Sequence, residues 1–318
     1  MKNLLFIATA CIGLYSNAQS PDLGNITVVS AGAVPKAGNT VVKSKSSLIE
    51  GEYDRQTGMY IAEPQYECLY NYVINNTNGD SPVKETTTCV LQIGDGVGRF
   101  CDYTVFTTDS ARYGTGADDM ELMQLANREH KNIYGYDEMV FQNLPAGEMT
   151  VYGNIAPNFF VYTENLNPIQ WQIGEATDTV CGYECMTAVG DYGGRRWQVW
   201  FTPDIPVTMG PWKFSGLPGL IMKAADLDGV HSFEAIGFRK GLMPVYKPNW
   251  PDAISTDREK FIKKKNEFEN TPDKIKKIPM EAIRSVTVLK SSDNEPSMVF
   301  NGVVVRNREN GYIPREIE

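Results

Sequence analysis

From about residue 65 onward, short runs of apolar residues alternate with residues that favour turns. Short apolar runs bounded by glycine, proline, asparagine and aspartate are typical of β-strands. Gly193-Gly194 and Asp228-Gly229 are the pairs that most favour tight hairpin turns between such strands. The pattern predicts strands at residues 69–74, 89–93, 100–106, 139–144, 149–152, 159–162, 169–173, 180–189, 197–201, 220–225 and 231–238.

Two segments depart from the strand pattern. Residues 115–118 can form a capping box, after which apolar residues recur at helical spacing up to a basic end near residue 131. Residues 256–259 form a second capping box, which predicts a helix that ends before Pro272. Residues 285–289 and 298–305 are predicted to pair as a last hairpin.

Many short, closely spaced strands with few helices indicate a β-dominated α+β fold. We expect a strongly curved antiparallel sheet, an open or half barrel, with two or three helices. The predicted organisation is a signal peptide at 1–18, an N-terminal leader or edge segment at 19–55 and a β-rich core at 56–250. Residues 251–318 would form a basic helix and a C-terminal hairpin packed on this core.

The first 18 residues have the features of a cleaved export signal. Lys2 precedes an apolar run over residues 4–15, and Ser16 and Ala18 place small residues where a signal peptidase recognises them. Cys11 lies inside the apolar run and not at its end, where a lipoprotein signal needs it. We expect cleavage after Ala18 and a location in the periplasm or cell envelope, without a later membrane-spanning segment.

The charge balance and the lack of four known enzyme motifs disfavour several classes of function. A formal net charge of −9 disfavours nucleic acid as a partner, because backbone binding needs a basic surface. The sequence lacks a serine nucleophile elbow, a P-loop, a zinc-protease motif and a dinucleotide fingerprint. We therefore expect no cofactor and a non-enzymatic role. His130 and His231 are predicted as surface or sheet-edge residues, and two histidines are too few to favour a metal site.

The cysteines offer one candidate disulfide. Five of the six follow the predicted signal peptide, and an oxidising compartment permits pairing. Cys89 and Cys101 flank a turn-like stretch at residues 93–97, and a symmetric hairpin there places them opposite each other. Either they form a disulfide or they are two buried thiols on neighbouring strands.

The most unusual stretch follows the predicted strand at 197–201. Prolines and glycines exclude regular structure through residues 203–219, yet three of the five tryptophans lie close to or within this stretch. A stiff apolar loop must pack against something. Trp212, Phe214 and Leu217 could plug one end of the chain's own sheet. The alternative is a cleft for an apolar ligand or a peptide, whose candidate residues are Trp197, Trp200, Trp212, Phe214 and Leu217.

The run Gly216, Leu217, Pro218, Gly219, Leu220, Ile221 ends this stretch, and Gly210-Pro-Trp-Lys-Phe214 precedes it. With the upstream tryptophan strand, these residues closely resemble the GLPGLI family of Bacteroidota exported proteins over about residues 170–238. The resemblance implies a β-rich fold and a place in the cell envelope, and it supplies no activity and no site residues.

Three functions remain open. The first is a non-enzymatic envelope protein that binds an apolar ligand, a lipid or a peptide. The second is a structural or accessory partner of another envelope protein, such as an outer-membrane receptor. The third is a hydrolase with an unrecognised carboxylate site.

Overall fold

The computed structural model describes residues 27–30, 59–78, 81–117, 121–122, 136–166, 169–250, 252–289, 297–305 and 311–317. The predicted signal peptide, most of the leader segment and His130 lie outside these ranges, as does most of the predicted helix at 115–131.

Twelve of the described strands form one sheet in the order β15-β8-β7-β6-β5-β4-β3-β13-β12-β11-β10-β9. Each pair is antiparallel except the parallel pair β15 and β8. The strands are β3 Tyr66–Asn76, β4 Val83–Gly94, β5 Val97–Asp102, β6 Met139–Gln142, β7 Glu148–Ile155, β8 Asn158–Asn165, β9 Gln172–Val180, β10 Tyr183–Tyr192, β11 Arg195–Thr202, β12 Leu220–Asp226, β13 His231–Lys240 and β15 Ile254–Ser255.

Smaller elements surround this sheet. Helix α1 (Tyr103–Thr115) and helix α3 (Arg258–Glu269) lie beside it, and two 3-10 turns, Lys274–Lys277 and Met280–Ala282, follow α3. Strands β2 (Met59–Ala62) and β14 (Val245–Lys247) form a two-stranded sheet. A four-stranded sheet contains β1 (Thr27–Ser30), β16 (Ser285–Leu289), β17 (Ser297–Phe300) and β18 (Val303–Val305). The β-dominated α+β fold with a curved, open sheet is the predicted one.

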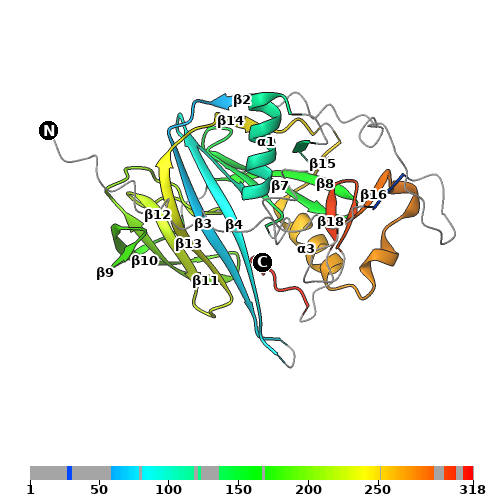
Figure 1. Cartoon of the computed structure of the whole chain (residues 1–318). Coiled ribbons are helices and arrows are strands. Elements are labelled where there is room, and N and C mark those ends of the chain that lie inside the picture. Colours follow the sequence, from blue (N-terminus) through cyan, green and yellow to red (C-terminus); the bar gives the residue numbers. More distant parts are fainter. Residues whose placement is uncertain are drawn as a thin grey trace, which may run out of the picture.

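The curvature of the sheet sets the position of the chain's last residues. Figure 1 shows β9 to β12 on one side of the long strands β3 and β4, and β7 and β8 on the other. Helix α3 lies below β7 and β8 in this view, and the end of the chain marked C lies beside β4, between β11 and α3 (Figure 1). The main core fills the face of the sheet that α3 covers, and it includes Phe261 of α3. A second core under α1 and β14 fills the opposite face of the sheet.

Local sequence explains both helices, and one of them was not predicted. The predicted helix that ends before Pro272 is confirmed as α3, but the capping box at residues 256–259 is wrong by one residue: the N-cap is Asp257, whose side chain accepts a hydrogen bond from Lys260 N–H at 2.8 Å. The predicted strand at 100–106 is wrong after Asp102. There the carboxylate of Asp102 accepts from Thr104 N–H at 2.8 Å, and α1 begins. The last hairpin is confirmed as β16 and β17, although Asn301 and Gly302 form a turn before β18.

The predicted pairing of Cys89 with Cys101 is wrong by one residue. Asp95 and Gly96 form a two-residue turn with φ values of 49° and 76°, which places Asp102 opposite Cys89 and Val90 opposite Cys101. A shift of one residue moves a side chain to the other face of a strand. Cys89 accordingly packs in the main core and Cys101 in the second core, and both thiols are free.

Candidate functional site

The proline-rich loop over residues 203–219 packs inside the molecule. Trp197 and the loop residues Trp212, Phe214 and Leu217 have exposed fractions of 0–2% and belong to the main core. The Phe214 ring lies 4.8 Å from Trp197 and 5.2 Å from Trp212, measured between ring centres. This placement is the one expected of a plug.

Trp200 lies apart from the other four candidate ligand-binding residues. It is part-exposed where Trp197 and Val199 on the same strand are buried, as alternation along a strand requires. The ammonium of Lys223 lies 5.0 Å from the centre of its ring. The five predicted residues therefore do not form one surface.

Gln142 and Gly219 fix the backbone of the loop. The amide nitrogen Nε2 of Gln142, at the end of β6, donates hydrogen bonds to the carbonyl oxygens of Gly210 at 2.9 Å and Trp212 at 2.8 Å. Gly219 has a φ of 156°, and a Cβ atom there would lie 2.1 Å from the carbonyl oxygen of Thr202. A glycine is needed at this position, so the six-residue run at residues 216–221 serves the close contact between the loop and β11.

Lys213 is the one charged residue in the aromatic part of the loop, and it is buried. Its Nζ atom lies 2.7 Å from a carboxylate oxygen of Glu164 and 2.6 Å from one of Glu316, and it donates to the hydroxyl of Tyr162 at 3.0 Å. Sequence reasoning missed this residue. The available signal was a lysine between two aromatic residues of a buried loop, which must bring its counter-ion with it.

Arg258, the first residue of α3, completes the arrangement around Glu316. Its Nη2 atom lies 2.6 Å and its Nε atom 2.8 Å from the second carboxylate oxygen of Glu316, and Nε lies 3.5 Å from Glu164. We call Lys213, Arg258 and Tyr162 the anion pocket. Three segments far apart in the sequence thus meet at one carboxylate.

The charges of the anion pocket stabilise each other. Burial alone would lower the pKa of Lys213, but Glu316 together with Tyr162, Tyr192 and Glu164 outweighs this effect and holds that pKa well above its ordinary value. Burial alone would raise the pKa of Glu316, and the cations of Lys213 and Arg258 overcome this and lower it. The side chains of Lys213, Arg258 and Glu316 are therefore charged at neutral pH.

Arg315, the neighbour of Glu316, occupies a second polar site. Its Nη2 atom lies 3.2 Å from a carboxylate oxygen of Asp137 and 3.1 Å from one of Glu138. Its guanidinium carbon lies 4.6 Å from the ring centre of Tyr136 and 5.4 Å from that of Tyr72. We call Asp137, Glu138, Tyr136 and Tyr72 the cation pocket.

Backbone contacts also hold residues 311–317, which lie along the inner face of the sheet. Arg195 of β11 donates from Nη2 to the carbonyl oxygen of Pro314 at 2.8 Å and from Nε to that of Arg315 at 3.2 Å. The N–H of Ile317 donates to the carbonyl oxygen of Gly193 at 2.8 Å. His231, predicted as a surface or edge residue, is buried, and its Nε2 atom lies 3.2 Å from the same Pro314 oxygen.

A groove of about 1010 Å³ opens beside the anion pocket. It runs between α3, the end of β8 and the turn that joins β10 to β11. Its walls carry both signs of charge together with apolar side chains, and they include Glu164, Tyr192, Arg258, Ile262, Asn266 and Ile317. The hydroxyl of Tyr192 is buried and makes no hydrogen bond within the described residues.

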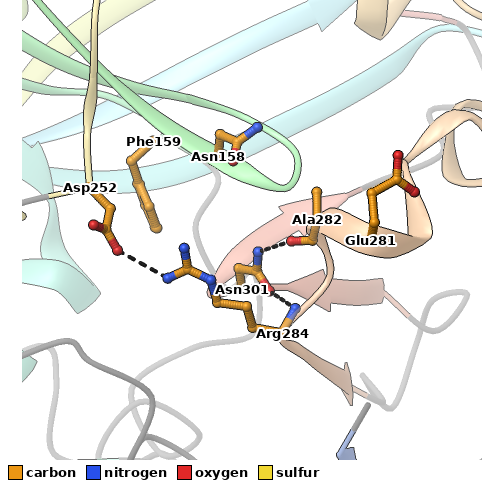
Figure 2. Close-up of a pocket in the computed structure, with 7 residues that line it drawn as sticks. All are labelled: Asn158, Phe159, Asp252, Glu281, Ala282, Arg284 and Asn301. Carbon is orange, nitrogen blue, oxygen red and sulfur yellow. Dashed lines mark hydrogen bonds and ion pairs between the residues drawn. The ribbon is translucent and has the colours of Figure 1, made fainter. Parts of the chain in front are cut away.

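Figure 2 shows a second, smaller cavity of about 160 Å³ between β8 and the segment around the 3-10 turn Met280–Ala282. Arg284 and Asp252 cross it as an ion pair at 3.0 Å. The side chain of Asn301 accepts from Arg284 N–H at 2.7 Å and donates to the carbonyl oxygen of Ala282 at 2.8 Å. Asp252, Arg284 and Asn301 thus use their polar groups to link the segments that line this cavity.

Neither a metal site nor a membrane-spanning helix is found among the described residues. No group of three or more histidine, cysteine, aspartate or glutamate side chains in them could hold a metal ion. Within the same ranges, the helices are too short or too polar to cross a lipid bilayer.

One family model matches the part of the chain that contains the loop. The model of a family described as a protein of unknown function (Porph_ging) matches residues 194–223, which span β11, the loop and the start of β12. Two crystal structures of PNGF-II in different space groups are similar at TM-scores of 0.42 and 0.43 and 15% sequence identity. These matches cover 63% of this chain but 32% of the PNGF-II chains, so the chain spans about a third of their length. No curated protein matches the sequence.

Proposed function

We propose that this chain is an exported, non-enzymatic protein of the cell envelope, of the GLPGLI type, that binds an extended peptide segment of a partner in the groove beside α3. The observation that carries the proposal is the way residues 311–317 lie on the inner face of the sheet. Hydrogen bonds to its backbone, a buried ion pair at Glu316 and a part-buried ion pair at Arg315 hold this segment in place. Contacts of these kinds also serve in peptide recognition.

The lining of the groove favours a peptide over a lipid. Lipid chains need continuous apolar walls, whereas Glu164, Arg258, Glu259, Lys263 and Glu267 all line this groove. The mixture of charged side chains with Ile262, Ile317 and the Tyr192 ring suits a chain that presents polar and apolar groups in turn. Trp197 and Trp212, two of the candidate ligand-binding residues, act in this proposal as the support beneath the pocket.

A selection with random heptapeptides displayed on phage, carried out on the full chain, tests the groove. Asn266→Trp places a large side chain on the groove wall, and the matched control Lys264→Trp changes an exposed residue of the same helix outside it. Peptides should be enriched on the unchanged chain and on Lys264→Trp, and enrichment should be lost on Asn266→Trp. Equal enrichment on both variants, or none on the unchanged chain, would overturn the proposal.

The export part of the proposal rests on the first 18 residues. We predict that the mature chain begins at Gln19, because Ala18 is the small residue placed correctly after the apolar run. N-terminal sequencing of protein from the periplasm of a producing cell measures this end. An intact Met1, or a lipid on Cys11, would contradict export by this route.

A further inference from the structure

We infer that the peptide bound by this chain carries a basic residue followed directly by an acidic residue and then an apolar one, the order that Arg315, Glu316 and Ile317 present. The inference rests on the proposed function and names the class of peptide that the site accepts. A segment of a partner with this order would take the place of residues 311–317 in the two pockets.

The two pockets differ in sign and are filled by adjacent residues. Arg315 is the cation that contacts both Asp137 and Glu138. Glu316 is the anion that contacts both Lys213 and Arg258. The chain bends at Arg315, and the side chains of this residue and of the next one enter the two different pockets. The two pockets therefore select a pair of neighbouring residues, and not two charges at any spacing.

Burial makes the choice of charge strict. The side chain of Lys213 has an exposed fraction of 0%, and those of Glu316 and Arg315 have 6% and 11%. A buried charge that loses its partner is strongly unfavourable, since water cannot replace the lost contact. An uncharged or reversed pair would remove the carboxylate that joins Lys213 to Arg258 and the cation that joins Asp137 to Glu138.

The remaining contacts do not depend on side chains. Arg195 binds the carbonyl oxygens of residues 314 and 315, and the carbonyl oxygen of Gly193 accepts from the N–H of residue 317. Any extended segment offers these groups. The backbone contacts thus provide affinity for a peptide, and the two pockets provide the selection.

The third position of the order faces the open groove. Ile317 is 53% exposed and lines the groove together with Ile262 of α3. A larger apolar residue at this position would bury more of the groove wall. The Tyr192 side chain also lines this groove and adds apolar ring surface to its wall.

Binding of a labelled peptide to the full chain tests the inference. The probe is the fluorescent heptapeptide Gly-Tyr-Ile-Pro-Arg-Glu-Ile, and its control has the same composition with Arg and Glu exchanged. The unchanged chain should bind the probe weakly, because its own segment competes at an effective concentration on the order of millimolar. Glu316→Gln weakens that competitor, so it should bind the probe at least tenfold more tightly than the unchanged chain and discriminate against the control peptide.

Two further variants place the binding in the anion pocket. Adding Arg258→Gln to Glu316→Gln should abolish binding of the probe, whereas adding Lys264→Gln, an exposed lysine of the same helix, should leave it unchanged. If Glu316→Gln does not fold, saturation-transfer NMR on the unchanged chain, which detects millimolar affinities, should give signals for the probe and not for the control peptide.

Equal binding of both peptides, or binding of neither to a folded Glu316→Gln chain, would overturn the inference. The phage selection distinguishes this failure from a failure of the proposed function. Peptides that are enriched at the groove without a basic–acidic pair would leave the groove as a binding site and remove the order assigned to it.

Discussion

His231 shows at the residue scale how burial turns one side chain into a source of pH dependence. Its Nδ1 atom lies 2.9 Å from the hydroxyl of Tyr72, and its Nε2 atom lies 3.2 Å from the carbonyl oxygen of Pro314. If Nε2 donates to that carbonyl, Nδ1 accepts from the tyrosine. Burial, followed by the cations of Arg315 and Arg195, lowers the pKa of His231 from 6.5 to about 3.

We predict that the unfolding free energy falls as the pH drops below about 6.5. The unfolded chain binds a proton at this histidine in that range, whereas the folded chain does not until about pH 3. Each pH unit therefore costs up to about 1.4 kcal/mol, or about 2 kcal/mol between pH 6.5 and pH 5. Urea unfolding at pH 7 and pH 5 measures the loss, which should shrink by about this amount in His231→Gln. An equal pH dependence in both proteins would refute the assignment.

Trp212 carries the second prediction at this scale. Because its side chain is fully buried against Trp197 and Phe214, Trp212→Ala should cost about 3–5 kcal/mol and lower the melting temperature by several degrees. Trp200→Ala, which truncates a part-exposed tryptophan of β11, should have a smaller effect. Thermal melts of the two variants measure the difference between their melting temperatures. A shift below about one degree for Trp212→Ala would exclude the plug.

The loop over residues 203–219 depends at the element scale on one close backbone approach. We predict that Gly219→Ala destabilises the chain by more than about 2 kcal/mol, because its Cβ would lie 2.1 Å from the carbonyl oxygen of Thr202 and its φ is 156°. Gly229→Ala is a matched control, since a Cβ there meets nothing within 4 Å although φ is also positive, at 72°. Urea unfolding should give a clearly larger loss for Gly219→Ala, and similar losses would contradict the role given to the motif.

The sequence predicts elements better than it predicts their contacts. Apolar runs between turn residues placed β11 to β13 correctly, because strand alternation and turn chemistry are local, whereas the predicted strand at 180–189 runs across the turn between β9 and β10. Helix α1 was missed because β-branched threonines and aromatic residues favour strands, and its cap at Asp102 and its packing through Phe106 outweigh them. The register of the hairpin formed by β4 and β5 was predicted wrongly because a turn placed one residue away changes every pair of residues that face each other across the hairpin.

The candidate site was beyond prediction for a different reason. Lys213 and Glu316 are separated by 103 positions, so no spacing rule connects them. Their charges were visible, but a lysine and a glutamate in a chain with 30 basic and 39 acidic residues point to no particular pair. The five residues first selected were chosen for aromatic or apolar character, and four of them became the core beneath the pocket.

At the scale of the whole molecule, segments far apart in the sequence are joined at the carboxylate of Glu316. Glu316 joins the loop through Lys213 and α3 through Arg258, and Glu164 of β8 contacts both cations. Residues 311–317 are in turn tied to β11 through Arg195. If these contacts act together, removing one partner must change how much the other contributes to the free energy of unfolding.

We predict strong coupling between Lys213 and Glu316 in a double-mutant cycle. Lys213→Met should cost about 3–5 kcal/mol, because it leaves the buried carboxylate of Glu316 without one of its two cations. Glu316→Gln should cost less, since Lys213 keeps the contact with Glu164. In Lys213→Met/Glu316→Gln neither charge remains, so the combined loss should be smaller than the sum of the two by about 1–3 kcal/mol.

The pair Lys223 and Glu234 is the control: it lies 2.9 Å apart with exposed fractions of 26% and 54%, so it should couple by less than about 1 kcal/mol. Urea unfolding of all six variants measures both cycles, and additive losses for Lys213 and Glu316 would show that the C-terminal segment does not hold the sheet, the loop and α3 together.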